Sequence, residues 1–261
     1  MGRRNAHRER RAFLSFLGFS LMGVSVFVLL PFLDVVRRSF VTVMSGKFAG
    51  LDNYKRVLTN QAFLLAVRNT VHFALVGIFL LIVIGLMAAL VLNRLRDVTF
   101  IKSLYLFPMA MPTATVVIVW RMFFYKQDFN SLVASYLWKN LGYTIVLWLA
   151  GIAGIPNEQI EAAKVDGADK WQCFWYIKLP CLKGSLYTIG ILSFLNSFKI
   201  YREAYLVAGA YPGQDIYLLQ HIFNNWYVNL ELDKMAAATV LVGGFLFVCI
   251  MLLNHFWNKE S

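Results

Sequence analysis

The segment "IPNEQIEAAKVDGADKWQCFWYIKLP" (155–180) is a polar stretch in an otherwise apolar chain. It holds four acidic residues and three lysines, and it is punctuated by Pro156, Gly167 and Pro180. Long apolar runs lie on both sides of it. We therefore expect this segment to connect two hydrophobic helices and to lie outside the hydrocarbon core of a membrane.

The residues of this segment predict two short helices joined by a turn. Asn157 is a good N-cap, and Glu158 lies in the first turn, where the helix dipole favours acidic side chains. Gly167 is expected to end the first helix, because glycine adopts the left-handed conformation there without strain. Asp169 is expected to cap a second helix, which Pro180 ends.

Two interpretations of the helix pair are open. Trp171, Phe174 and Trp175 fall at positions i, i+3 and i+4, so they form one apolar stripe that suits lipid headgroups or the ends of the neighbouring spans. The alternative is a docking element, in which small side chains allow close approach and a carboxylate meets an arginine. Acids are a poor choice for binding lipid, which favours a protein partner. The docking candidates are Glu158, Glu161, Ala162, Ala163 and Ala168.

The whole chain has the composition of a polytopic membrane protein. Hydrophobic residues make up 59% of its 261 positions and charged residues only 15%. The formal charge is +11, but the basic residues are spread between apolar runs and form no patch for nucleic acid. We expect a basic tail over 1–11 and one membrane domain over 12–261, in contact with lipid and with no nucleic-acid partner.

Six segments are long and apolar enough to cross a bilayer as helices, which need about 20 such residues. They are approximately 12–36, 67–92, 103–124, 131–154, 184–209 and 235–257. The first is too long for the hydrophobic region of a signal peptide, so we expect it to remain as a span. Pro108 and Pro112 predict a kink or a break in the third. The predicted fold is all-α.

Lysines and arginines in the loops predict the orientation, because they gather on the cytoplasmic side of a membrane. With six spans, the N-terminal tail, the loop NRLRDVTFIK (93–102) and segment 155–180 fall on one side, and each carries several basic residues. That side is predicted to be the cytoplasm, which places both termini there.

The sequence holds no motif for chemistry on a substrate. G-x-x-x-x-G-K-[ST] does not occur, so the chain has no P-loop, and any energy from ATP must come through a partner. The four histidines are scattered, and the three cysteines have no metal-ligand spacing. We therefore expect no enzyme activity, no metal site and no cofactor bound by this chain.

The fifth span carries ionisable residues, which are expensive inside a bilayer. In one interpretation Lys199 and Glu203, at i and i+4, form an ion pair near the outer interface while Arg202 reaches the headgroups. In the other, the polar side chains of this span line a route for a sugar, whose hydroxyls need donors, acceptors and aromatic faces. The pathway candidates are Asn196, Ser197, Lys199, Tyr201 and Arg202.

The residue order of segment 155–180 resembles the EAA loop of permease subunits in binding-protein-dependent ATP-binding-cassette importers. Glu161-Ala162-Ala163, Asp166-Gly167-Ala168 and Ile177–Pro180 carry the match. Upstream stretches are similar to the carbohydrate-uptake branch, in particular to the larger maltose-type permease. They are FAGLDNYKRVL (48–58), VRNTVHF (67–73) and YLFPMAMPTATVVIVWRMFF (105–124). The similarity continues through LNSFKIYREAYLVAG (195–209), so it covers nearly the whole chain.

This resemblance implies a six-span type I importer permease in a bacterial or archaeal cytoplasmic membrane. It implies a second, related permease, a solute-binding protein, and two cytoplasmic ATPase subunits that hold ATP and Mg²⁺. The EAA loop is expected to be the coupling loop to the ATPase, with Glu161 paired to a basic residue there and Gly167 forming the turn. The coupling residues implied are Glu158, Glu161, Ala162, Ala163, Asp166, Gly167 and Ala168.

Two other classes of transport protein remain as alternatives. A stand-alone secondary transporter driven by an ion gradient would favour inverted repeats and carboxylates at the membrane midplane. Here the acids are concentrated in the loops, and Glu203 alone lies well within a predicted span. A passive channel would conduct without any energy source.

Overall fold

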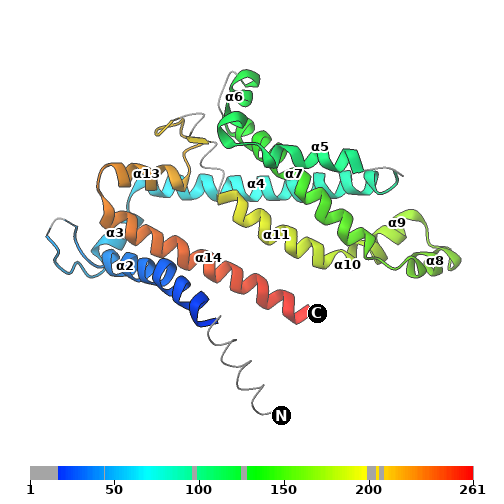
Figure 1. Cartoon of the computed structure of the whole chain (residues 1–261), viewed down its shortest axis with the longest axis horizontal. Helices are drawn as coiled ribbons and strands as arrows, with labels where there is room; N and C mark the ends of the chain where they lie inside the picture. The colour runs from blue at the N-terminus through cyan, green and yellow to red at the C-terminus, as the bar shows by residue number, and fades with distance from the viewer. Residues whose placement is uncertain are drawn as a thin grey trace, which may run out of the picture. The chain divides into compact units, whose positions relative to one another are not determined.

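The computed structural model describes residues 17–43, 45–95, 99–124, 128–198, 204–205 and 209–260. Figure 1 shows the helices of this part of the chain, whose only β feature is an isolated bridge between Val41 and Phe48. The prediction of an all-α fold is confirmed for these residues. They form two compact units, one made of Met1–Asn60 with Asn225–Leu253 and the other of Gln61–Asn224 with Asn254–Ser261.

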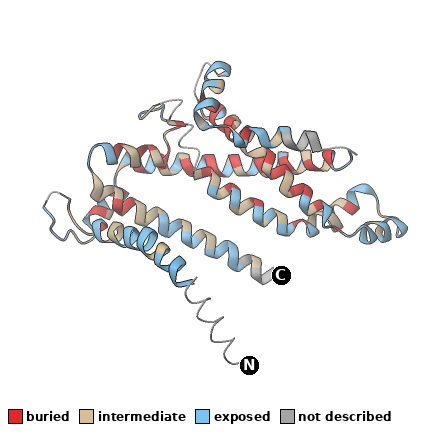
Figure 2. Cartoon of the chain, in the orientation of Figure 1, coloured by how far each residue is buried: buried red, intermediate tan, exposed pale blue. Residues whose placement is uncertain are grey.

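Three helices form the centre of the larger unit. They are α4 (Gln61–Leu92), α7 (Phe129–Ala153) and α11 (Lys183–Ser197). Apolar side chains from these helices make two buried clusters, one around Phe73 and Tyr136 and the other around Trp148 and Ile189. The buried residues run along α4 and α7 in Figure 2. α4 begins at Gln61, earlier than the predicted 67, because the side chains near its start are already buried.

The third predicted span is two helices. α5 (Thr99–Ala110) and α6 (Thr113–Phe123) are bent by 112° relative to each other. Pro112 is extended, with φ −58° and ψ 138°, and it precedes α6, whereas Pro108 lies inside α5. The predicted break is therefore confirmed at Pro112, where the chain leaves the helical conformation and the proline has no N–H to donate.

Segment 155–180 forms the two predicted helices, although their ends differ from the prediction. The elements are α8 (Asn157–Val165), α9 (Lys170–Cys173), η2 (Phe174–Lys178) and α10 (Leu179–Cys181). Pro180 does not end the second helix, which continues to Cys181. η2 is a π-helical turn, and Leu179 N–H bonds to Phe174 O, five residues back. This wider turn accommodates a residue that lacks an N–H.

The smaller unit consists of long helices and a short helical connection. Its elements are a continuous helix Leu17–Ser39 that includes η1 (Ser25–Leu29) and α2 (Leu30–Ser39), then α3 (Asp52–Leu58) and most of α14 (Leu232–Glu260). α13 (Leu219–Val228) precedes α14. Asn53 Nδ2 donates to Ser39 O at 3.0 Å and to Val41 O at 3.1 Å, so α3 is held against the end of α2.

Among the described residues, three helices are long and apolar enough to cross a membrane, and the α5–α6 pair adds a fourth if it is one span. The three are Leu17–Ser39, Gln61–Leu92 and Leu232–His255. The predicted spans 131–154 and 184–209 coincide with α7 and α11, but α11 has only 15 residues. The tail 1–11, residues 199–203 and residues 206–208 lie outside the described residues. The count of six spans therefore stays a prediction.

Candidate functional site

α8 presents acids and alanines on an uncovered surface. None of its residues is buried, and Glu158, Glu161 and Ala162 are exposed while Ala163 is half-buried. The predicted N-cap was wrong by one residue, because the extended residue before the helix is Pro156, with φ −61° and ψ 128°. Side chains this small leave the helix backbone open to close approach by another surface, with two carboxylates beside it.

Gly167 makes the turn that was predicted for it. Its φ is +85°, a left-handed conformation that costs other residues roughly 1–2 kcal/mol. Ala168 N–H bonds to Ala163 O at 2.9 Å, and Gly167 N–H bonds to Lys164 O at 3.1 Å. These bonds satisfy the last carbonyls of α8 and reverse the chain direction.

Asp169 fixes the start of the second helix. Its Oδ1 accepts from Gln172 N at 2.7 Å, and Gln172 Oε1 accepts from Asp169 N at 2.8 Å. This reciprocal pair is a capping box, which confirms the predicted cap. Local hydrogen bonds therefore hold the turn at both of its ends.

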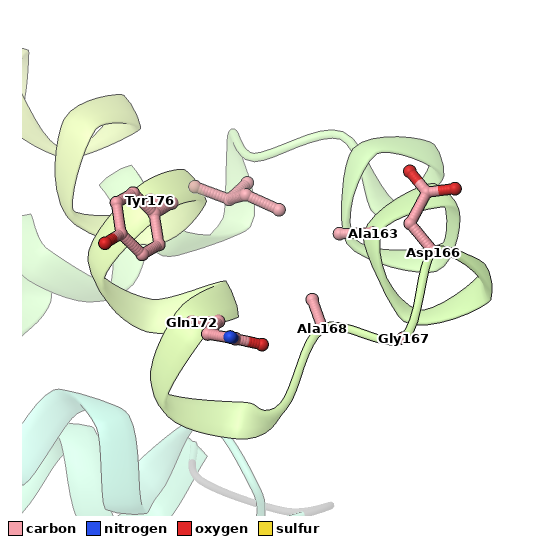
Figure 3. Close-up of a pocket in the computed structure, with 7 residues that line it drawn as sticks. Ala163, Asp166, Gly167, Ala168, Gln172 and Tyr176 are labelled. Atoms are coloured by element: carbon pink, nitrogen blue, oxygen red, sulfur yellow. The ribbon is translucent and has the colours of Figure 1, made fainter.

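A shallow cavity of about 370 Å³ lies between the two short helices. Figure 3 shows Ala163 and Asp166 on one side of it, Gln172 and Tyr176 on the other, and Ala168 near Gly167 at its base. One carboxylate, one amide and one phenol thus border a space large enough for a side chain. The sequence predicted the turn but gave no sign of the cavity, because its walls come from both helices.

The interpretation in which the aromatic stripe packs against the spans was wrong for its two tryptophans, whereas Phe174 is half-buried. Trp171 is 71% exposed and Trp175 is 55% exposed. The inner face of this helix is formed by Cys173, which is 5% exposed, with half-buried residues beside it. Two apolar stripes share this helix, and their spacing alone could not say which one packs inward.

Of the predicted pathway residues, the structure describes Asn196 and Ser197, while Lys199, Tyr201 and Arg202 lie outside the described residues. Ser197 is 1% exposed, and its Oγ donates to Phe194 O at 2.7 Å within its own helix. Asn196 is half-buried and reaches across to another helix. Their place on a substrate route stays a prediction.

Asn196 belongs to a polar cluster that the sequence reading missed. Its Nδ2 donates to Tyr143 Oη at 3.3 Å, and Tyr143 Oη lies 3.2 Å from Ser193 Oγ. Tyr136 Oη donates to Ser193 O at 2.9 Å. The cluster joins α7 to α11 by side chains from two predicted spans. A signal was available, since polar side chains in the middle of apolar helices point to a pathway or a buried contact.

A family model for the binding-protein-dependent transport system inner membrane component matches residues 81–259, which is more than half of the chain. The chain belongs to this family. The predicted membership is therefore confirmed, and the matched range contains α8, the Gly167 turn and the Tyr143 cluster.

Curated relatives of this permease align over most of its length. The osmoprotective compounds uptake permease GgtC of Synechocystis is 25% identical, over 90% of this chain and 94% of the relative. The trehalose/maltose transport system permease MalF of Thermococcus litoralis is 28% identical, over 79% and 80%. The multiple sugar-binding transport system permease MsmF of Streptococcus mutans is 27% identical, over 82% and 81%.

Two solved structures share the fold. A bacterial ABC transporter involved in the import of the acidic polysaccharide alginate aligns with a TM-score of 0.78 at 15% identity, over 99% of both chains. The same kind of transporter in complex with its alginate pentasaccharide-bound periplasmic protein gives a TM-score of 0.78 at 16% identity, over 98% of this chain and 97% of the other. Identities this low establish the fold and nothing about substrate.

Proposed function

We propose that this chain is the permease subunit of an ATP-driven importer for a sugar or oligosaccharide delivered by a solute-binding protein. The observation that carries the proposal is the exposed α8–Gly167 turn in a permease of this family that has no P-loop of its own. Relatives named for trehalose/maltose and for multiple sugars support a carbohydrate as the substrate class.

The turn is proposed to dock on one of two cytoplasmic ATPase subunits that bind ATP and Mg²⁺. Glu161 would pair with a basic side chain there, since a carboxylate and an arginine form strong charge-assisted hydrogen bonds. The alanines let the partner approach the helix closely, and the cavity beside Asp166 could receive one of its side chains. The proposed coupling residues are Glu158, Glu161, Ala162, Ala163, Asp166, Gly167 and Ala168.

The proposed topology has six spans with both termini in the cytoplasm of a bacterium or archaeon. α7 and α11 would complete the set with residues that follow Ser197, and the basic loops would lie inside. A second, related permease would share the membrane domain, and the solute-binding protein would dock on the opposite side. In this arrangement the two permeases would enclose the substrate route together.

The substrate route is proposed to pass the cluster of Tyr143, Ser193 and Asn196. These three side chains offer hydroxyl and amide groups next to an aromatic ring, which is the chemistry that sugar hydroxyls need. Ser197, Lys199, Tyr201 and Arg202 would continue the route. The three side chains are hydrogen-bonded to one another. A sugar hydroxyl that enters the cluster would replace these hydrogen bonds with its own, so few polar groups would be left unpaired.

Alternating access would follow from the shared states of the two sites. ATP binding closes the ATPase pair and moves α8, and this motion is transmitted through the rigid Gly167 turn to α11. The coupling is reciprocal, so the loaded binding protein outside must also stimulate ATP hydrolysis inside.

Reconstitution tests this proposal directly. The permease, its partner permease and the ATPase subunits are placed in proteoliposomes with ATP inside, and uptake of a radiolabelled sugar is measured with the binding protein outside. Glu161→Lys should abolish uptake and binding-protein-stimulated ATP hydrolysis while the complex still inserts. Gln159→Lys is the matched control, since it adds a positive charge to another position of α8 and should retain uptake.

Other outcomes would favour another class. Uptake by vesicles that lack the ATPase subunits but carry an ion gradient would indicate a secondary transporter. Equilibration of the sugar with no energy source would indicate a channel. Wild-type uptake by Glu161→Lys would remove α8 from the coupling mechanism.

A further inference from the structure

The second helix of the loop carries an uncovered surface that the proposed coupling role does not use. We name it the basic-aromatic surface and define it as Lys170, Trp171, Trp175 and Lys178, of which Lys178 is half-buried and the other three are exposed. Both tryptophans are exposed, at 71% and 55%, and they lie at i and i+4. Trp171 is two residues from buried Cys173, which places the two on opposite sides of the helix. The two tryptophans therefore point away from the rest of this unit.

This surface is also separate from the cavity between the short helices. From the second helix, the cavity takes Gln172, Tyr176 and Ile177 as lining residues, and neither tryptophan is among them. A partner seated against α8 and the Gly167 turn would leave the tryptophans uncovered. We therefore expect a different partner to cover the two tryptophans.

The two halves of the loop carry opposite charge. Residues 157–168 hold three carboxylates and one lysine, a formal charge of −2, whereas residues 169–178 hold two lysines and one aspartate, a formal charge of +1. The aspartate of the second half, Asp169, is engaged in the capping box. The second half thus presents cations with aromatic rings, and the first half presents acids.

We propose that the basic-aromatic surface lies on the anionic headgroups of the cytoplasmic leaflet. Tryptophan and lysine together are typical of membrane interfaces, where indole rings sit at headgroup level and lysines meet anionic lipid. Protein interfaces are enriched in tryptophan and arginine but depleted in lysine, and segment 155–183 contains no arginine. The composition therefore matches lipid better than an ATPase groove.

The position along the chain places this surface at the membrane. Leu182, with φ −84° and ψ 0°, is the link to α11, which begins at Lys183, one residue before the predicted fifth span. Figure 1 shows the chain changing direction between α10 and α11. Leu182 therefore separates the helix that ends at Cys181 from α11, and we expect the former to lie across the end of the span. An amphipathic helix in this place lies in the interface plane with its rings toward the acyl chains.

The two helices of the loop would then have different roles. The tryptophans hold the second helix on the bilayer, and the Gly167 turn holds α8 away from it in water. A docking element supported in this way keeps its orientation whether or not an ATPase is bound.

Spin labels test the surface in the assembled transporter. Trp171→Cys or Trp175→Cys is introduced where Cys173, Cys181 and Cys249 are replaced by serine, and the complex is reconstituted in phosphatidylethanolamine and phosphatidylglycerol. We expect a nitroxide at either site to collide more with oxygen than with a water-soluble nickel chelate, with and without the ATPase subunits. Val165→Cys, at an exposed position of α8, should show the reverse preference when no ATPase is bound.

Two results would overturn the proposal. If the label is accessible to the nickel chelate without the ATPase subunits and is protected when they are added, the surface binds the ATPase. A label open to the chelate in both states would leave the surface in water. Neither result bears on sugar uptake, so the proposed function is tested separately.

A second measurement covers the case in which the serine background does not assemble. Lipids brominated near the headgroup end of the acyl chain quench nearby tryptophans. In the otherwise native complex, the double variant Trp171→Phe/Trp175→Phe should show less quenching by these lipids than the native protein. Quenching by lipids brominated near the chain ends should be the same in both. Equal headgroup-end quenching of both proteins would count against lipid contact.

Discussion

The backbone carbonyl of Tyr105 lies where a side chain at position 142 would begin, so α5 and α7 meet backbone to backbone at Gly142. A Cβ built on Gly142 would overlap Tyr105 O. Helices in membranes pack most closely where small residues let the backbones touch, and such contacts add Cα–H···O interactions. This crossing fixes α5, which ends just before the break at Pro112, to the central helix of the larger unit.

Gly142→Ala should therefore destabilise the protein although alanine favours helices. The obstacle is backbone and not the flexible end of a side chain, so α5 must move away from α7. Forcing extra atoms into a packed site typically costs about 1–3 kcal/mol. The measurement is the thermal unfolding midpoint of the complex in detergent, which should fall by several degrees.

Gly190→Ala is the matched control for that substitution. Gly190 is also in a helix, and a Cβ there would meet nothing within 4 Å. Its midpoint should stay the same or rise slightly, because alanine is the better helix former. An equal fall in both variants would mean that the loss comes from adding a methyl group to any helix and not from the contact with Tyr105.

Gly167→Ala should reduce transport while leaving insertion intact. Alanine at φ +85° is strained by about 1 kcal/mol or more, and relief of that strain turns α8 relative to the second helix. Space is not the issue, since a Cβ there has no neighbour within 4 Å. Uptake and ATP hydrolysis should become uncoupled, with hydrolysis less dependent on the binding protein. Gly184→Ala, also in open space and without a positive φ, should transport normally.

His221 predicts that stability depends on pH. It is fully buried in α13, its Nδ1 accepts from Leu218 N at 3.1 Å, and Tyr217 stacks on its ring. Burial lowers the pKa of His221 from 6.5 to about 4. Between pH 6.5 and pH 4 the unfolded chain therefore binds a proton at this histidine that the folded chain does not bind. The contribution is complete above pH 6.5 and is lost as the pH falls toward 4, with a loss on the order of 1–2 kcal/mol near pH 5.

His221→Asn separates this effect from general acid sensitivity. The asparagine Oδ1 can accept the same Leu218 N–H, but the side chain does not titrate. The unfolding midpoint of the variant should change less between pH 7 and pH 5 than that of the native protein. If His221→Asn kept the native slope, another group would be responsible.

The sequence was most informative where local chemistry decides the structure. Gly167 and Asp169 form their turn and capping box through bonds within a few residues, so the loop could be predicted closely. Pro112 breaks the third span for the same reason. By contrast, the inward face of the second helix depends on its packing neighbours. The sequence predicted one apolar face, at Trp171, Phe174 and Trp175, and it did not show that Cys173 would be the buried side chain.

The polar cluster could not be predicted from the sequence for a related reason. Asn196 stood out as a polar residue in a span, but its partner Tyr143 is separated from it by the whole coupling loop. Helical spacing relates residues of one helix and says nothing about which residue of another helix they meet. The pairing of α7 with α11 had to be seen in three dimensions, and so did the contact between Gly142 and Tyr105.

Tyr143→Phe should impair transport more than stability. The hydroxyl of Tyr143 joins Ser193 to Asn196, and in the proposed route it is a group that meets a sugar hydroxyl. A lost hydrogen bond of about 1.4 kcal/mol would lower uptake about tenfold at low sugar concentration. Tyr136→Phe is the contrast, since the buried Tyr136 donates to the Ser193 carbonyl and serves packing. It should lower the unfolding midpoint and leave the preference among sugars unchanged. Tyr143→Phe with native uptake but a lowered midpoint would make the cluster a structural contact and move the substrate route elsewhere.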